Sequence, residues 1–190
     1  HSRFSHTDPE LCINGINREL NAGAEQLHRV SWLLVTFGTA YVYSLRETGK
    51  VVANCHKLPA SLFDRRRVGV DEMLRGWIPL IERLSGSNPE LRIMFTVSPI
   101  RHLRDGAHEN QLSKSVLLLF VDELCRMYPD RCIYFPSYEI VMDELRDYRF
   151  YDAGMTHPNE QAIRYIWERF SEACFSEETR TLNREWERLE

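Results

Sequence analysis

The chain has 190 residues, of which 43% are hydrophobic and 27% charged, and its formal net charge is −4. This length is enough for one domain with a sizeable core. The acidic balance argues against non-specific binding to nucleic acid or anionic membranes, and no apolar run approaches the roughly 20 residues that span a bilayer. We therefore predict one domain over residues 1–190, a charged helical tail at residues 176–190, no nucleic-acid partner and no membrane span.

Cysteine usage gives a further expectation about the compartment. The number of cysteines is odd and no Cys-x-x-Cys pair occurs, so neither a disulfide framework nor a four-cysteine zinc site is indicated. A reducing compartment is the simpler interpretation, and we assign the chain to the cytoplasm. Because it starts at His1 without an initiator methionine or a signal peptide, we expect a fragment or a processed form of a longer protein.

The first stretch of the chain predicts a helix followed by a buried strand. Asp8 suits the N-cap and Pro9 the first helical position, and leucine and isoleucine recur after them at helical spacing. Residues 31–37 then form a continuous apolar run, which is typical of a strand buried on both faces of a parallel sheet. This strand ends at the turn Gly38-Thr39-Ala40.

The next thirty residues carry weaker signals. Residues 41–48 continue apolar and then become polar, and residues 47–50 are typical of a turn; we interpret residues 51–57 as a short extended piece and residues 59–70 as a basic connector. Within the connector, the three consecutive arginines at residues 65–67 are interpreted as a solvated face.

Two further helix–strand pairs follow. A helix begins at Asp71, with Pro79 predicting a kink or a break inside it, and a buried strand follows at residues 91–97. An apolar helix over residues 113–127 leads to a third strand at residues 131–135. Alternation of this kind predicts parallel strands joined by right-handed crossovers, with helices on both faces. The predicted fold is therefore α/β, a three-layer α/β/α sandwich.

A polar loop runs into the last long helix. It carries Asp152 and His157, and Pro158 suits the first position of the helix that follows. A carboxylate shortly before a histidine at the mouth of a packed helix is suited to orient the imidazole for general-base work. The alternative interpretation is that His157 only caps the helix.

Polar side chains also follow each predicted strand. They lie in the turn after residue 37, in the Ser98–His102 segment and in residues 136–139. Ligands of open parallel sheets bind outside the carboxyl ends of the strands. The convergence of these segments with His157 at one edge of the sheet favours an enzyme.

Two of these features leave alternatives open. The Ser98–His102 segment either contacts an oxygen of the substrate or an oxyanion, or it is a turn in which Arg101 pairs with a carboxylate of residues 139–152. The charged residues 143–149 either hold a substrate anion or brace the loop before His157 as an ion-pair network, which is the interpretation that we favour.

Cys55 and His56 allow two further interpretations. Cys55 is a candidate thiol nucleophile if it lies near His157. The pair is also a candidate half of a metal site with His102 and His157, but no ligand spacing supports such a site. We therefore predict no metal and no cofactor.

Several ordered motifs together resemble the GSCFA family over nearly the whole chain. The matching pieces are Val35-Thr-Phe-Gly38-Thr-Ala-Tyr-Val-Tyr43, Val52-Ala-Asn-Cys-His-Lys57, Phe95-Thr-Val-Ser-Pro-Ile-Arg-His102, Asn110-Gln-Leu-Ser-Lys114, and Tyr134-Phe-Pro-Ser-Tyr-Glu139 through Leu145-Arg-Asp-Tyr-Arg-Phe-Tyr151 to His157-Pro158.

That family is similar to the SGNH, or GDSL-type, ester hydrolases, which have a flavodoxin-like fold, a serine nucleophile near the N-terminus and an Asp-x-x-His near the C-terminus. The resemblance implies that His157 is the catalytic base. Gly154 stands three residues before it, where relatives carry aspartate, so Asp152 is the candidate partner; a dyad without aspartate is the alternative. Ala40 stands where relatives carry an oxyanion-binding asparagine. The candidate oxyanion and substrate-binding residues are Gly38, Thr39, Asn54, His56, Ser98, Arg101 and His102.

The nucleophile is the largest departure from the family pattern. The Gly-Ser-Cys-Phe-Ala string does not occur, and neither Ser2 nor Ser5 follows a strand or a glycine turn. We expect the first strand and the nucleophile to precede His1. The resemblance implies a serine ester hydrolase acting on an acyl ester, such as an O-acyl group of a carbohydrate. Acyl transfer to a sugar shares every residue, and the alternative function is a non-catalytic glycan- or protein-binding module.

Overall fold

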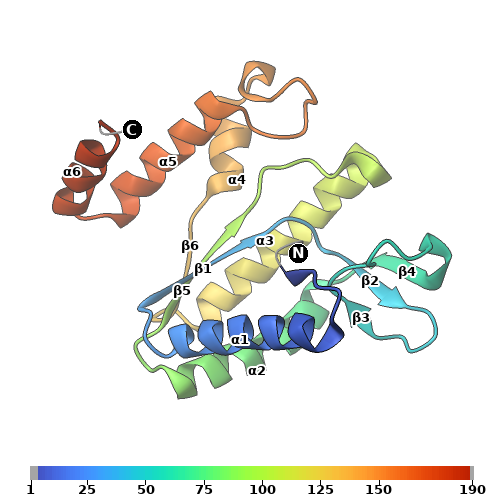
Figure 1. Cartoon of the computed structure of the whole chain (residues 1–190). Helices are drawn as coiled ribbons and strands as arrows, with labels where there is room; N and C mark the ends of the chain where they lie inside the picture. The colour runs from blue at the N-terminus through green and yellow to red at the C-terminus, as the bar shows by residue number, and fades with distance from the viewer. Residues whose placement is uncertain (1–3, 189–190) are drawn as a thin grey trace.

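The computed structural model describes residues 4–188, and its centre is a three-stranded parallel sheet (Figure 1). The strands are β1 (Trp32–Phe37), β5 (Arg92–Val97) and β6 (Cys132–Tyr134), in the spatial order β1-β5-β6. Phe37 lies opposite Val97, and Phe95 lies opposite Tyr134. All three predicted strands are confirmed, and their parallel register brings their carboxyl ends to one edge. The expected burial of β1 on both faces is wrong, because its residues alternate between exposed and half-buried.

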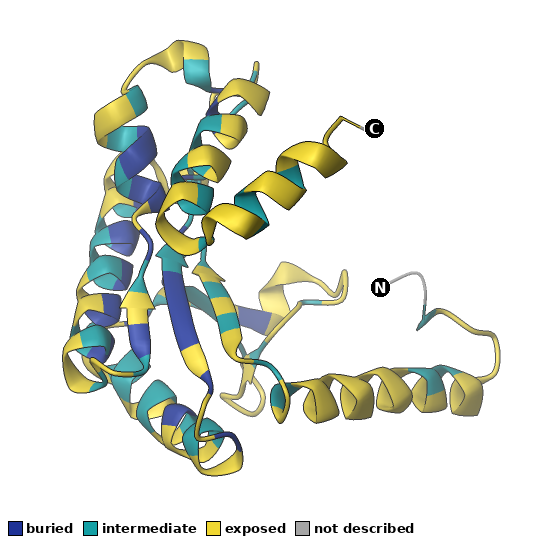
Figure 2. Ribbon diagram, turned by 90° about the vertical axis from the view of Figure 1, so that its left-hand side faces the viewer, coloured by how far each residue is buried: buried dark blue, intermediate teal, exposed yellow. Residues whose placement is uncertain are grey.

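Helices cover both faces of this sheet, which confirms the predicted α/β sandwich. On one face, α2 (Val70–Ser87) and α3 (Ala107–Met127) pack over a core that includes Ile81, Phe95 and Phe120. On the other face, α5 (Glu160–Cys174) packs over Met94 and Phe135 (Figure 2). Aromatic rings from β1, α2, β5 and α3 meet edge to face at the centre of the larger core; such ring pairs add stability beyond the area that they bury.

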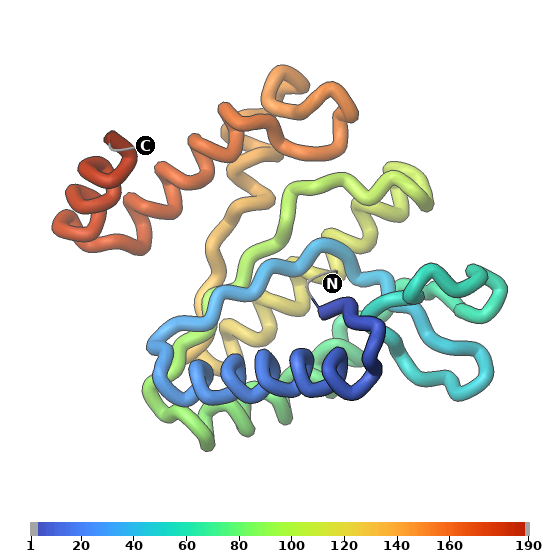
Figure 3. Tube along the Cα trace, viewed as in Figure 1, coloured from blue at the N-terminus to red at the C-terminus, as the bar shows by residue number. Residues whose placement is uncertain are grey.

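A second, antiparallel sheet stands beside the first and was not predicted. It consists of β3 (Val51–Val52), β2 (Tyr41–Leu45) and β4 (Phe63–Arg67), in the order β3-β2-β4. The Cα trace leaves β1, enters β2 directly and returns through β4 to α2 (Figure 3). The predicted basic connector is therefore wrong: its second half pairs with β2 over the whole length of that strand.

The three arginines of β4 do not form one solvated face either, because Arg66 alone is exposed while Arg65 and Arg67 are half-buried. Arg65 pairs with Asp105 at 2.5 Å, and its side chain is only 18% exposed. Arg66 pairs with Glu72 of α2 at 2.6 Å. Side chains alternate along a strand, so neighbouring arginines meet different partners. The prediction failed because a run of charged residues does not show the apolar alternation that indicates a strand.

Two helix predictions also need correction. Of the kink or break predicted at Pro79, the break does not occur, because α2 continues from Val70 to Ser87 around the proline. The helix predicted from residue 113 begins at Ala107 instead, so that Asn110 lies in its first turn. The residues of that turn are mostly polar, so the spacing of apolar residues did not indicate where the helix begins.

The charged stretch after β6 does not form the ion-pair network that was predicted to brace the loop before His157. Short helical turns occupy it: α4 (Ser137–Glu139), a π-helical turn (Ile140–Leu145) and a 3-10 turn (Tyr148–Phe150). Within residues 143–149 of the described chain, a single ion pair forms, between Arg149 and Asp147 at 3.6 Å. The predicted ion-pair network is therefore wrong.

The two terminal helices extend from the body of the molecule. In α1 (Pro9–Leu27), Asp8 caps the helix as predicted, with Oδ1 accepting from the Glu10 N–H at 2.9 Å. No residue of this described helix is buried. The predicted tail contains α6 (Glu177–Trp186), and its last two residues lie outside the described range. Across residues 4–188, no helix combines the length and apolar composition that a bilayer span requires.

Candidate functional site

The polar segments predicted to converge do so at the carboxyl edge of the parallel sheet. The ends of β1 and β5 are bonded directly, because the Ser98 N–H donates to Phe37 O at 2.8 Å. The end of β6 joins them through Ser137, whose hydroxyl donates to Val97 O at 2.9 Å and also hydrogen-bonds Thr96. The sheet therefore presents one continuous polar rim.

His157 lies in a closed loop beside this rim. The Asp152 N–H donates to His157 O at 2.8 Å, and Tyr151 forms an isolated bridge with Pro158. Together these contacts close the loop just before α5 and fix the backbone of the histidine. The His157 side chain is 58% exposed, so its ring is open to a ligand.

Asp152 approaches the His157 ring without bonding it firmly. Its Oδ2 lies 3.7 Å from Nδ1, beyond ordinary hydrogen-bond length, while Oδ1 lies 3.4 Å from the N–H groups of both Thr156 and His157. The closer partner is Thr156, whose Oγ1 lies 2.9 Å from Nδ1. Sequence reasoning missed Thr156, although its place next to the histidine was visible. The catalytic roles of His157 and Asp152 stay predictions.

Arg101 links the rim to the histidine loop. Its N–H donates to Thr156 O at 3.0 Å, and its guanidinium lies 4.1 Å from the ring centre of Tyr151. A longer contact of 3.4 Å reaches Met155 O. The alternative in which Arg101 pairs with a carboxylate of residues 139–152 is therefore wrong. Among residues 4–188, its partners are carbonyl oxygens and tyrosine faces, with no carboxylate within ion-pair distance.

His102 packs against the turn after β1. Its N–H donates to Asn110 Oδ1 at 2.8 Å, and its Nε2 lies 3.3 Å from where a Cβ on Gly38 would stand. A side chain at position 38 would therefore require the ring or the turn to shift by a few tenths of an ångström. Burial lowers the pKa of His102 below its ordinary value, and the charges of Lys114, Arg65 and His157 lower it further. The imidazole is therefore neutral near pH 7 and can donate through one ring nitrogen.

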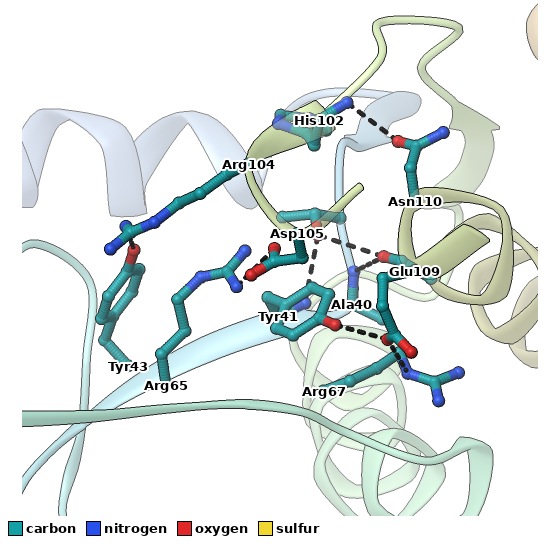
Figure 4. Close-up of polar contacts among 12 residues, drawn as sticks. Ala40, Tyr41, Tyr43, Arg65, Arg67, His102, Arg104, Asp105, Glu109 and Asn110 are labelled. Carbon is teal, nitrogen blue, oxygen red and sulfur yellow. Dashed lines mark hydrogen bonds and ion pairs between the residues drawn. The ribbon is translucent and has the colours of Figure 1, made fainter. Parts of the chain in front are cut away.

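A polar network holds the segment around His102 to the small sheet (Figure 4). The Tyr41 hydroxyl donates to Glu109 at 2.6 Å, and this hydrogen bond raises the pKa of Tyr41. Arg65 pairs with Asp105, and Arg104 donates to the Tyr43 hydroxyl. β2 and β4 thereby support the loop that carries His102, which gives the unpredicted sheet a role at the site.

Ser113 and Lys114 are the other site residues that sequence reasoning missed. Ser113 Oγ accepts from the Ala40 N–H at 2.8 Å and lies 3.1 Å from Thr39 Oγ1. Lys114 Nζ donates to the carbonyl oxygens of Gly38 and Ser98. The available signal was a lysine inside an apolar helix, since lysine is almost never fully buried without a partner.

Asn54, Cys55 and His56 are not brought to this rim. They lie in the loop that follows β3, where Asn54 Oδ1 accepts from the His56 N–H at 2.7 Å. Within residues 4–188, none of them forms a hydrogen bond or an ion pair with His157 or Ser98. Nor does this described part of the chain hold any group of three or more His, Cys, Asp or Glu residues suited to a metal ion. Ser5 is exposed ahead of α1, and Ser2 lies outside the described residues.

Two hollows flank the histidine loop. An apolar groove of about 570 Å³ runs between the sheet and α5, lined by Leu34, Phe135, Ile163 and Trp167, with Ser98 and His157 at its polar end. A smaller hollow of about 340 Å³ is lined by Arg101 together with Asn110, Gln111 and Tyr138. The Tyr138 hydroxyl donates to Gln111 Oε1 at 3.0 Å. The site therefore offers an apolar groove and a smaller hollow in which polar and apolar side chains are mixed.

The fold and this rim define an α/β sandwich protein with a candidate site at the carboxyl edge of a parallel sheet. The chain belongs to the GSCFA family, because the model of that family matches residues 1–170. This match confirms, at the level of the family, the resemblance seen in the motifs. No curated protein and no solved structure matched the chain.

Proposed function

We propose that this chain is the major part of a serine ester hydrolase that acts on an acyl ester, such as an O-acyl group of a carbohydrate. The observation that carries the proposal is the position of His157. An exposed imidazole, oriented at Nδ1 by Thr156 and approached by Asp152, lies at the polar end of an apolar groove. This combination suits a general base beside an ester.

The proposed reaction has two halves. A serine hydroxyl attacks the ester carbonyl carbon while His157 takes its proton, and collapse of the tetrahedral intermediate breaks the C–O bond as His157 returns that proton to the leaving alcohol. Water then attacks the acyl-enzyme in the same way, which releases the acid and restores the serine. In acyl transfer, a sugar hydroxyl takes the place of this water.

We assign the nucleophile to a segment that precedes His1. In the described chain, the outer edge of β1 pairs with no strand, although its run Trp32–Phe37 lacks the charges and prolines that protect natural edges. Leu34 on its open face is 56% exposed. A parallel strand added here would end beside Gly38, and a helix after it would cover the apolar groove. The nucleophile would then stand next to His157.

Few hydrogen-bond donors at the site are available to stabilise the oxyanion. The Ala40 N–H is already committed to Ser113 Oγ, and Asn54 lies in the loop after β3. The neutral ring of His102 at the edge of Gly38 is the better candidate. Aimed N–H donors of this kind stabilise charge that develops on the carbonyl oxygen.

A non-catalytic glycan- or protein-binding module is the second candidate. It is favoured by the 3.7 Å separation between Asp152 and the His157 ring and by Ala40 at the place of the expected asparagine. Such a module would use the polar hollow lined by Asn110, Gln111 and Tyr138 without any covalent step.

Fluorophosphonate labelling followed by intact-mass measurement separates these functions. We would compare the uninterrupted product of the gene with the 190-residue chain, each with His157→Ala and with His108→Ala, an exposed histidine of α3, as the control. The proposal expects one adduct on the long form, abolished by His157→Ala only. An adduct on the short chain would move the nucleophile to a described hydroxyl such as Ser98. No adduct on either form would refute the serine mechanism and favour the binding module.

A further inference from the structure

The buried ammonium group of Lys114 joins the ends of two neighbouring strands. Its Nζ donates to Gly38 O, just after β1, and to Ser98 O, just after β5, both at 2.6 Å. The residue is 1% exposed. Taking an ammonium ion out of water carries a penalty of several kcal/mol, so an apolar side chain would serve packing alone better. The position instead demands a donor that reaches two carbonyl oxygens.

The neighbouring residues of α3 complete the same attachment. Ser113 Oγ accepts from the Ala40 N–H and contacts the Thr39 hydroxyl. One dipeptide of α3 therefore holds the turn after β1 at three points: the carbonyl of Gly38, the hydroxyl of Thr39 and the N–H of Ala40. Asn110, one turn earlier on the helix, holds the backbone of His102.

We propose that Lys114 is a positioning residue of the candidate site: it sets the spacing between the β1 and β5 ends and thereby the place of the His102 ring against Gly38. The catalytic consequence rests on the proposed ester hydrolase, but the positioning itself does not. Loss of the ammonium leaves two buried carbonyl oxygens without their donor, which is unfavourable. The turn and the Ser98–His102 segment are then free to separate.

The charge of Lys114 also acts on His102 through space. The charged groups that face this ring come from three elements: Lys114 on α3, Arg65 on β4 and His157 in the loop before α5. All three disfavour an imidazolium. Removing one of them moves the titration of His102 in a known direction, which a purely structural role of Lys114 would not do selectively.

Titration of the imidazole Cε1–H signals by NMR tests the inference on the wild-type chain, on Lys114→Met and on Lys50→Met, an exposed lysine of a turn. We expect Lys114→Met to raise the titration midpoint of His102 and to shift its Cε1–H signal, while the Cε1–H signals of exposed His28 and His108 keep their positions. Lys50→Met should change none of them. An unmoved His102, or a change spread over all histidines, would overturn the inference.

A second measurement applies if Lys114→Met fails to fold. In the wild-type chain, the Lys114 ammonium should show scalar couplings across its hydrogen bonds to the carbonyl carbons of Gly38 and Ser98. An ammonium that exchanges with water as rapidly as that of Lys50 would contradict the inference.

Labelling rates separate this inference from the proposed function. On the uninterrupted gene product, Lys114→Met should slow fluorophosphonate labelling by about a hundredfold, the usual effect of a reacting group misplaced by about 1 Å. If the wild-type product takes no label, the hydrolase fails while the His102 titration still decides the role of Lys114. If the product labels and Lys114→Met labels at the wild-type rate, the positioning role is refuted.

Discussion

Gly38 carries the tightest steric constraint of the candidate site. A Cβ at this position would stand 3.3 Å from Nε2 of His102, so the ring or the turn must move by a few tenths of an ångström to accept it. The constraint is one of space, because the imidazole occupies the volume that any side chain would need.

We therefore expect Gly38→Ala to displace the His102 ring and to lower the free energy of unfolding by about 1 kcal/mol, as mild overpacking does. The Cε1–H signal of His102 should shift while that of exposed His28 stays in place. Urea unfolding measures the stability and NMR the displacement. An unshifted His102 signal would mean that the turn yields instead of the ring.

The lowered pKa of Lys114 predicts that the stability of the protein depends on pH. A comparison of wild type with Lys114→Met isolates this contribution. Burial lowers the pKa of Lys114 to about 8, from an ordinary value of 10.5, so between these values the unfolded chain binds more protons than the folded one. Stability then rises with pH. The difference in unfolding free energy between wild type and Lys114→Met should grow in favour of wild type from pH 8 to 10.5, by at most about 3 kcal/mol. Urea unfolding at several pH values measures this difference, and a difference that does not change with pH would contradict the prediction.

At the scale of elements, α2 tolerates a proline without a break. Pro79 is exposed and lies on the outer side of the helix, while the opposite side, including Trp77 and Ile81, packs into the core. Tertiary packing along one face therefore holds the helix together across a residue that disfavours it.

Pro79→Ala should raise the free energy of unfolding by about 1 kcal/mol, because alanine restores a backbone donor and removes the ring clash with the preceding turn. Gly76→Ala is the matched control on the same helix: it meets no atom within 4 Å and should add roughly 0.5–1 kcal/mol from backbone entropy. Urea unfolding compares the two. A loss of stability in Pro79→Ala would show that the proline ring contributes packing.

At the scale of the whole molecule, one side of the parallel sheet is only partly covered. Figure 2 shows α1 standing away from the body on the side of the sheet where α5 lies. The apolar residues of β1 and α5 on this side are largely exposed: Leu34, Ile163 and Trp167. An apolar surface of this extent is typical of a site covered by another segment or partner, which agrees with the strand and helix proposed to precede His1.

Leu34→Glu should distinguish a covered from an uncovered β1. In the 190-residue chain, Leu34 is 56% exposed, so the change should alter stability by less than about 0.5 kcal/mol. In the uninterrupted gene product, a covered Leu34 should make the same change destabilising by roughly 3 kcal/mol. Leu119→Glu, at a 60% exposed position of α3, is the control in both forms. Equal effects of Leu34→Glu in the two would refute the proposed docking.

Local patterns were enough for much of the parallel half of the fold. The apolar run of β1, the Asp8 cap and the polar residues after each strand depend on neighbours in the chain, so they could be predicted. The small sheet could not, because Arg65 is placed in β4 by pairing with Tyr43 of β2 and by an ion pair with Asp105. Both partners are distant in the sequence, so the residues next to the arginines do not indicate that they form a strand.

The family resemblance, the alternation of helices and strands, and the polar rim at the carboxyl ends of the strands could all be predicted from local motifs and spacing. The three-dimensional arrangement was needed to show that Thr156 lies nearer than Asp152 to the His157 ring, that Asn54 lies away from the rim, and that Lys114 joins two strand ends. The contact of Thr156 depends on side-chain orientation within one loop, whereas the other two findings depend on segments that are far apart in the sequence. Hydrogen-bond partners such as Lys114 and Gly38 are 76 residues apart, and folding alone sets the angstroms between them.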